Sequence, residues 1–175
     1  MNIVLIGFMG TGKSAIGRAL ARRMSARFFD TDAEIERQAG CSVAEFFALE
    51  GEAAFRALET ETLRSLVAQN NPMVVATGGG TPLRPENAAL LQELGAIVWL
   101  TATPEVILSR VGHAWESRPL LANYRDDPLT RIEILIAERA PRYQAVAQWE
   151  FDTGTCGGPE ESAEHILRLL PEENM

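Results

Sequence analysis

The amino-acid sequence predicts an α/β fold in which a mostly parallel β-sheet carries helices on both faces. Short apolar runs rich in β-branched residues alternate along the chain with longer segments of helical periodicity. A glycine-rich loop at residues 7–14 (GFMGTGKS) joins the first of these runs to the first helical segment. No linker, repeat or low-complexity stretch divides residues 1–175, so we expect one domain with one core.

The expected strands are short and mostly end in glycine, aspartate or another turn residue. They lie at residues 2–6, 27–29, 73–76, 96–100 and 148–152. Parallel strands collect their carboxyl ends at one edge of a sheet, and ligands of open α/β sheets bind outside that edge. The residues that directly follow the strands are therefore the first candidates for a functional site.

The expected helices fill the segments between the strands. They lie at residues 13–24, 33–69, 86–94, from 104 onward, from 128 to about 140, and at 160–170. Breaks are expected in the second of these near Gly40 and Gly51, and Ser42 with Glu45 forms a possible capping box. Pro141 is expected to kink or end the helix that starts at 128.

Charge and cysteine content exclude several classes of protein. Sixteen basic residues against 24 acidic ones give a net charge of −8, which disfavours nonspecific binding to nucleic acid or anionic membranes. No apolar run is long enough for a membrane span, and no secretory signal is visible. Cys41 and Cys156 lie far apart in the sequence and form no metal-ligand spacing. We expect a reduced cytoplasmic chain, monomeric, with small-molecule partners.

The loop at residues 7–14 satisfies the pattern G-x-x-x-x-G-K-[ST] through Gly7, Gly12, Lys13 and Ser14. Glycines allow the backbone N–H groups to wrap phosphates, the lysine reaches the β- and γ-phosphates, and the serine hydroxyl can ligate Mg²⁺. The next helix presents its positive end to the same anion. A chance glycine-rich turn is the alternative, but the loop lies directly between a strand and a helix. We therefore predict nucleotide binding.

Two carboxylates, Asp30 and Asp32, follow the second strand. One could hold Mg²⁺, directly or through water, and the other could accept a hydrogen bond or a proton from an attacking hydroxyl. The structural alternative makes Asp30 a turn residue and Asp32 the N-cap of the next helix. Beside a phosphate loop, the functional interpretation is favoured.

Several arginines are candidates for binding an anionic substrate. Arg56 lies three residues before Glu59, Arg118 precedes a proline, and Arg139 and Arg142 flank Pro141. Each could be an ordinary surface residue. Guanidinium groups also bind carboxylates bidentately and neutralise a migrating phosphoryl group, so together they favour phosphoryl transfer to an acid.

The glycine triplet at residues 78–80 follows the third strand. Three glycines are costly in chain entropy, which is explained where the backbone must approach a ligand closely. Neither His113 nor His165 is expected to be catalytic, because the first lies in a loop of mixed composition and the second in the last helix.

Taken together, these motifs resemble the shikimate kinase family over nearly the whole chain. The matching segments are GFMGTGKS, FFDTDAEIE, FFALEGEAAFRALE, TGGG, SRPLL and ERAPRY, in that order. The resemblance implies a P-loop NTPase of adenylate-kinase-like fold with a five-stranded parallel sheet. It further implies a substrate-binding region at about 32–60, a lid at about 112–123, and transfer of the ATP γ-phosphate to the 3-hydroxyl of shikimate.

The resemblance also assigns roles by position. Lys13, Asp32 and Arg118 would be catalytic, and Ser14 and Asp30 would hold Mg²⁺. Glu59 would orient Arg56. The residues implied to contact ATP are Gly10, Thr11, Gly12, Lys13, Ser14, Ala15, Arg110 and Arg118. Those implied to contact shikimate are Asp32, Arg56, Gly78, Gly79, Gly80 and Arg139.

Other interpretations remain open at this point. Gluconate kinase has a related fold and an acidic substrate, although TGGG and RPLL argue against it. Nucleoside monophosphate kinases fit less well, because nothing indicates a base-reading pocket. A binding module without turnover is disfavoured by the intact Lys13, Asp32, Arg118 and Arg139. The segment 112–117 (GHAWES) departs from the family by carrying His113 and Trp115.

Overall fold

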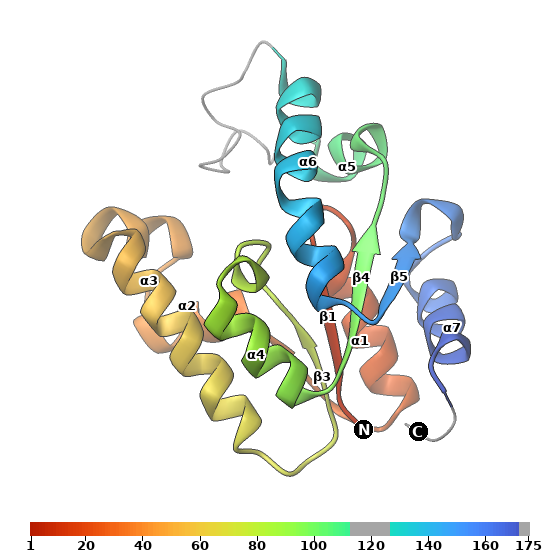
Figure 1. The fold of residues 1–175 in the computed structure, drawn as a ribbon, viewed down its shortest axis with the longest axis horizontal. Helices are drawn as coiled ribbons and strands as arrows, with labels where there is room; N and C mark the ends of the chain where they lie inside the picture. The colour runs from red at the N-terminus through yellow and green to blue at the C-terminus, as the bar shows by residue number, and fades with distance from the viewer. Residues whose placement is uncertain (113–126, 172–175) are drawn as a thin grey trace.

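A five-stranded parallel sheet forms the centre of the computed structural model, which describes residues 1–112 and 127–171. The strand order is β2-β3-β1-β4-β5 (Figure 1). The strands are β1 (Ile3–Gly7), β2 (Arg27–Asp30), β3 (Met73–Ala76), β4 (Ala96–Thr101) and β5 (Trp149–Asp152). The predicted sheet is therefore confirmed, with strand ends shifted by about one residue.

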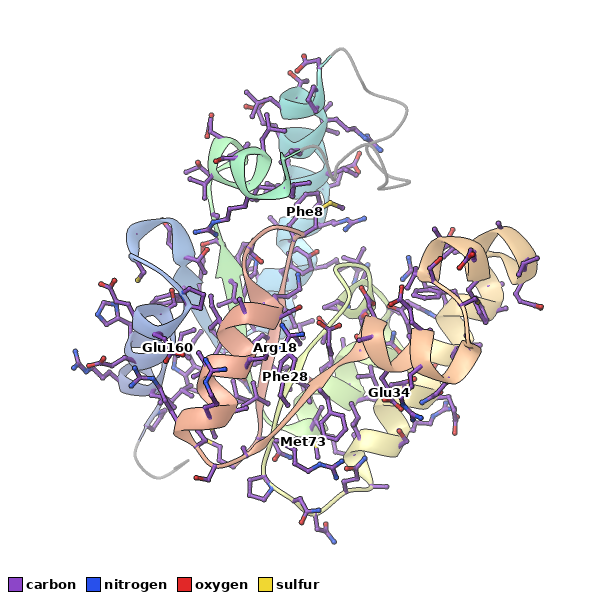
Figure 2. The ribbon with its side chains drawn as sticks, turned by 180° about the vertical axis from the view of Figure 1, so that it is seen from behind. Phe8, Arg18, Phe28, Glu34, Met73 and Glu160 are labelled. Atoms are coloured by element: carbon purple, nitrogen blue, oxygen red, sulfur yellow. The ribbon has the colours of Figure 1, made fainter. Side chains whose placement is uncertain are left out.

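The sheet separates two apolar layers, because successive side chains of a strand point to opposite faces. On one face, Ile3 and Leu5 of β1 pack in a buried cluster with apolar residues of α1 (Lys13–Arg23) and α7 (Pro159–Leu169). Val4 and Ile6 join the other cluster, which contains α4 (Pro85–Leu94), the later turns of α3 (Val43–Val67) and the end of α6 (Pro128–Val146). Helices cover both faces, as predicted. In Figure 2, seen from behind, α1 comes to the front.

Two glycines interrupt the helical segment that follows β2, as predicted. Gly40, at φ 71°, ends α2 (Thr31–Ala39), and Gly51, at φ 82°, breaks α3. Ser42 begins α3 as half of a capping box: its hydroxyl accepts from the Glu45 N–H, and the Glu45 carboxylate accepts from the Ser42 N–H. These breaks project α2 and the start of α3 away from the sheet (Figure 1).

Pro141 neither ends nor visibly splits α6, which runs on to Val146, so the predicted end near 140 is wrong. The helix continues because Tyr143 and Val146, one turn further on, are buried against β4 and β1 in the same apolar cluster. Burial of these two side chains outweighs the hydrogen bond that proline cannot donate.

Short elements complete the fold. The 3₁₀ turn η1 (Thr81–Leu83) follows the glycine triplet, α5 (Pro104–Val111) follows β4, and η3 (Thr153–Thr155) follows β5. None of the helices described has the length and apolar composition that crossing a membrane requires.

Candidate active site

The loop between β1 and α1 has backbone conformations that favour glycine. Gly7, Gly10 and Gly12 have φ values of 141°, 77° and 92°. A Cβ at Gly7 would also lie 2.4 Å from the carbonyl oxygen of Leu100 in β4. Side chains at these positions would strain the loop, so the predicted phosphate loop has its required geometry.

The lysine of the motif lies over this loop. Lys13 is the first residue of α1, and its Nζ donates to the carbonyl oxygens of Gly7 and Phe8 at 2.9 Å each. The buried Thr11 hydroxyl donates to Phe8 at 2.8 Å, which tightens the turn. Gly12 is the N-cap and Ala15 is exposed in the first turn, so the positive end of α1 faces the loop.

Ser14 and Asp30 lie together, as the sequence predicted. The Ser14 hydroxyl donates to Asp30 Oδ2 at 2.5 Å, and Asp30 Oδ1 accepts from the Ala33 N–H at 3.4 Å. Asp30 is therefore the N-cap of α2, whereas the structural alternative had assigned that position to Asp32. A hydroxyl and a carboxylate at a phosphate loop are the oxygen ligands that Mg²⁺ prefers.

The glycine triplet lies against the predicted acceptor-binding side chains. A Cβ at Gly78 would lie 2.5 Å from Asp32 Oδ1, and one at Gly80 would lie 2.7 Å from Arg56 Nη1. None of the three glycines has a positive φ. A Cβ at Gly78 or Gly80 would therefore displace a charged group from the place that it occupies in the structure.

The middle glycine joins this cluster to the phosphate loop. A Cβ at Gly79 would lie 3.4 Å from Arg139 Nη1 and 3.5 Å from the carbonyl oxygen of Gly7. Arg139 also lies over the ring of Phe8, with its guanidinium carbon 5.5 Å from the ring centroid. Phe8, a residue of the phosphate loop itself, packs against α5 and α6 and is labelled in Figure 2.

Two buried hydroxyls hold the triplet in place, and the sequence analysis did not single them out. Thr31 Oγ1 accepts from the Gly78 N–H at 3.0 Å, and Tyr143 donates to the Gly79 carbonyl at 2.6 Å. Both residues are 1% exposed. Both residues lie in segments already quoted for their charged residues: Thr31 between the two aspartates of D-T-D, and Tyr143 directly after Arg142 at the end of E-R-A-P-R-Y.

Arg56 is held by a buried carboxylate. Arg56 Nη1 lies 2.6 Å from Glu59 Oε2, and the other oxygen of Glu59 accepts from the Thr81 hydroxyl at 2.6 Å. Burial opposes the charge of the guanidinium, but hydrogen bonds and the negative charges of Glu59 and Glu52 outweigh it and raise the pKa of Arg56. Arg56 thus stays cationic with a fixed orientation.

The second arginine of the cluster affects Tyr143. Burial raises the pKa of the Tyr143 phenol, although the neighbouring charge of Arg139 opposes this shift. The phenol therefore remains a neutral hydrogen-bond donor near pH 7. Arg142, by contrast, is exposed on α6 and belongs to no part of this cluster.

Arg110 connects three segments on the far side of the phosphate loop. From the end of α5 it donates to the hydroxyl and the carbonyl of Thr153 at 2.7 and 2.8 Å, and to the carbonyl of Gly10 at 3.4 Å. The η3 turn and the phosphate loop are thus held together by a residue that the family resemblance implies for ATP binding. The predicted lid lies outside the described residues except for Gly112, as do Arg118, His113 and Trp115.

Comparison with known proteins identifies the family. The family model described as Shikimate kinase matches residues 9–171. The chain belongs to the shikimate kinase family. It is 47% identical over 173 residues to the shikimate kinase of Pelotomaculum thermopropionicum, covering 99% of this chain and 97% of the relative. To that of Symbiobacterium thermophilum it is 47% identical over 148 residues, covering 84% and 83%.

Solved structures support the same assignment. The shikimate kinase from Acinetobacter baumannii in complex with shikimate superimposes with a TM-score of 0.87 at 36% identity, covering 96% of this chain and 91% of that one. The Bacteroides thetaiotaomicron shikimate kinase gives 0.85 at 34%, covering 97% of each chain. The P-loop, adenylate-kinase-like fold is therefore confirmed, and the chain is a kinase.

Proposed function

We propose that this chain transfers the γ-phosphoryl group of ATP to the 3-hydroxyl of shikimate, giving ADP and 3-phosphoshikimate on the route to chorismate and the aromatic amino acids. Family membership supports the reaction. One observation of the structure carries the acceptor assignment. Asp32, Arg56 and Arg139, from three different helices, converge on a glycine triplet that adjoins the phosphate loop.

Two cations beside a carboxylate suit a hydroxy-acid. Arg56 and Arg139 would bind the substrate carboxylate, because guanidinium groups form charge-assisted hydrogen bonds with it. Asp32 would orient the acceptor hydroxyl and take its proton late, since a loose phosphoryl-transfer transition state asks little of a base. The N–H groups of residues 78–80 would line the remaining side of the acceptor.

The donor side would be formed by residues 10–15. Their backbone N–H groups and Lys13 would neutralise charge on the phosphates, and Arg110 would lie near the adenine. Ser14 and Asp30 would hold Mg²⁺, which would supply positive charge beside the phosphates. Arg118, from the R-P-L-L segment, is proposed as a further cation on the transferred group.

The proposal includes a monomer in the cytoplasm, with residues 32–60 as the substrate-binding region and 112–123 as the lid. Both cysteines are free, which suits a reducing compartment. Analytical ultracentrifugation of the full chain tests the monomer: a sedimentation coefficient that rises with protein concentration contradicts it.

A coupled ADP-release assay with shikimate, gluconate and quinate as alternative acceptors tests the reaction. We expect shikimate to stimulate ADP release far above the rate without acceptor, and the other two acids much less. The assignment is wrong if shikimate gives no stimulation. Preference for gluconate would instead support the related sugar-acid kinase.

Two neighbouring arginines of α6 provide a matched pair for the acceptor site. Arg139→Ala should raise the KM for shikimate about 10- to 150-fold, because a charge-assisted hydrogen bond contributes about 1.5–3 kcal/mol. Arg142→Ala removes an exposed cation from the same helix and should leave the KM unchanged. Equal effects of the two variants would contradict the proposed carboxylate contact.

A further inference from the structure

Three potential metal ligands gather at the start of α7, away from the phosphate loop. They are Cys156, Glu161 and His165, and one ligand atom from each lies within 4.8 Å of the others. The sequence did not reveal this cluster, because the two cysteines lie too far apart to form a metal-ligand motif and neither points to Glu161 or His165. The cysteine precedes the helix, whereas the carboxylate and imidazole share one helix face at positions i and i+4.

The thiol and the imidazole are already at the separation that zinc requires. Cys156 Sγ lies 3.5 Å from His165 Nδ1. With a Zn–S bond of about 2.3 Å and a Zn–N bond of about 2.05 Å at a tetrahedral angle, the two ligand atoms are about 3.5 Å apart. The ring of Phe151 in β5 lies beside the imidazole in a T-shaped arrangement, with the two ring centroids 6.4 Å apart.

Glu161 has the acceptor capacity that a third ligand needs. Its Oε2 accepts from the Gly157 N–H at 2.7 Å, and a Cβ at Gly157 would lie only 2.8 Å from that oxygen. Within the described residues Glu161 makes no ion pair. Its neighbours Glu160 and Glu164 do: the first pairs with Arg22 and Arg23 and the second with Arg23 and Arg168.

We propose that Cys156, Glu161 and His165 form a surface site for a divalent transition metal ion of the zinc class, with water completing a tetrahedron. Zinc accepts thiolate, imidazole and carboxylate ligands together, whereas Mg²⁺ prefers oxygen ligands alone and does not favour the thiolate and the imidazole. The metal would join the segment after η3 to α7. Because Thr153 of η3 is bonded to Arg110, this segment adjoins the nucleotide side of the catalytic site.

Cobalt titration of the chelator-treated full chain, with Mg²⁺ in excess to occupy the Ser14 and Asp30 site, tests the proposal. Bound Co²⁺ should give a thiolate-to-cobalt charge-transfer band that saturates at one ion per chain and disappears when Zn²⁺ is added. Cys156→Ser should lose this band and Cys41→Ser should keep it. A band that depends on Cys41, or no thiolate band at all, would overturn the site.

Variants of the two exposed ligands, Glu161 and His165, test the site even if the cysteine variant does not fold. His165→Gln and Glu161→Gln should each weaken Zn²⁺ binding at least about tenfold, measured by competition with a chromophoric chelator, since even outer-shell partners of a metal contribute that much. Glu160→Gln, which changes the adjacent exposed carboxylate paired with Arg22, should leave the affinity unchanged. Equal Zn²⁺ affinities of the wild type and His165→Gln contradict the proposal.

Discussion

The two halves of the proposed catalytic site are built in different ways. The phosphate loop is one short stretch, residues 7–14, in which the backbone conformation of three glycines and the first residue of α1 supply most of the geometry. The acceptor half draws Asp32 from α2, Arg56 from α3 and Arg139 from α6 onto the glycine triplet after β3. One half is local and the other depends on tertiary packing.

This difference determines how each half can fail. Substitution within the phosphate loop would act directly on nucleotide binding, because the proposed contacts come from the substituted stretch itself. The acceptor half can also be damaged indirectly, through residues that never touch substrate but place a charged group. Kinetic constants for the two substrates, measured separately, distinguish these two kinds of effect.

The largest effect is expected from Asp32→Asn. It retains the shape of the side chain but removes the negative charge that we propose orients the acceptor hydroxyl, so kcat should fall about 100-fold or more. The KM for ATP should change less than about threefold, because Asp32 lies against Gly78 in the acceptor half. Steady-state kinetics with both substrates varied provides the measurement.

Glu34→Gln is the matched control for this variant, since Glu34 lies two residues further along α2 and pairs with Arg37. Its kcat should stay near that of the wild type. A substantial kcat in Asp32→Asn would show that the carboxylate is structural, and the division between the two halves would need to be redrawn.

A pair of glycine substitutions should separate catalysis from binding within the acceptor half. A Cβ at position 78 forces the Asp32 carboxylate to move, and a Cβ at position 80 forces the Arg56 guanidinium to move. Gly78→Ala should therefore lower kcat about tenfold or more, whereas Gly80→Ala should mainly raise the KM for shikimate. Both variants should keep the wild-type KM for ATP.

Thermal melting serves as the control for this pair. The groups to be displaced are the ends of flexible side chains, so both proteins should unfold within a few degrees of the wild type. The same kinetic defect in both variants would mean that the triplet acts as one structural unit, and that each glycine is not matched to one charged group.

The fold and the phosphate loop could be predicted from the sequence because their signals are local. Apolar runs, helix breaks at Gly40 and Gly51, and the G-x-x-x-x-G-K-S pattern each act within a few residues. The extension of α6 past Pro141 could not be predicted, since the buried packing of Tyr143 and Val146 decides it.

The acceptor half was predicted through family motifs, and only the structure gives its physical basis. The glycine triplet was predicted to mark a close backbone approach to ligand, and the structure places beside it charged side chains that are 24 to 60 positions distant along the chain. Thr31 and Tyr143 were missed for the same reason, because a hydroxyl acquires meaning only from the distant backbone group that it contacts.

A smaller effect is expected on the donor side from Arg110→Met. The substitution keeps an unbranched side-chain stem but removes the guanidinium and with it the hydrogen bonds to Thr153 and Gly10. The η3 turn would be held less firmly, so the KM for ATP should rise about three- to tenfold while that for shikimate stays constant. Isothermal titration with a nonhydrolysable ATP analogue checks this. Unchanged affinity for the analogue would remove Arg110 from the donor half.

The smallest effect is expected from Tyr143→Phe, which tests whether a residue without substrate contact positions the acceptor half. Loss of the hydrogen bond to Gly79 should lower the free energy of unfolding by about 1 kcal/mol and raise the KM for shikimate a few-fold, with that for ATP unchanged. If the variant loses stability but keeps the wild-type KM for shikimate, Tyr143 stabilises the fold without positioning the acceptor half.

The pH dependence of stability gives this variant a second readout. Burial raises the pKa of Tyr143 above that of an unfolded tyrosine, about 10, although Arg139 opposes the shift. Below pH 10 its contribution to stability is fully present. Above pH 10 the unfolded chain has released a proton that the folded chain keeps, so the free energy of unfolding falls as pH rises.

Urea denaturation at pH 8 and at about pH 10.5 tests this dependence. Between these two pH values the wild type should lose more free energy of unfolding than Tyr143→Phe. Equal losses would mean that the phenol is not held neutral by its site, and that the acceptor half depends on Arg139 and the glycine backbone without it.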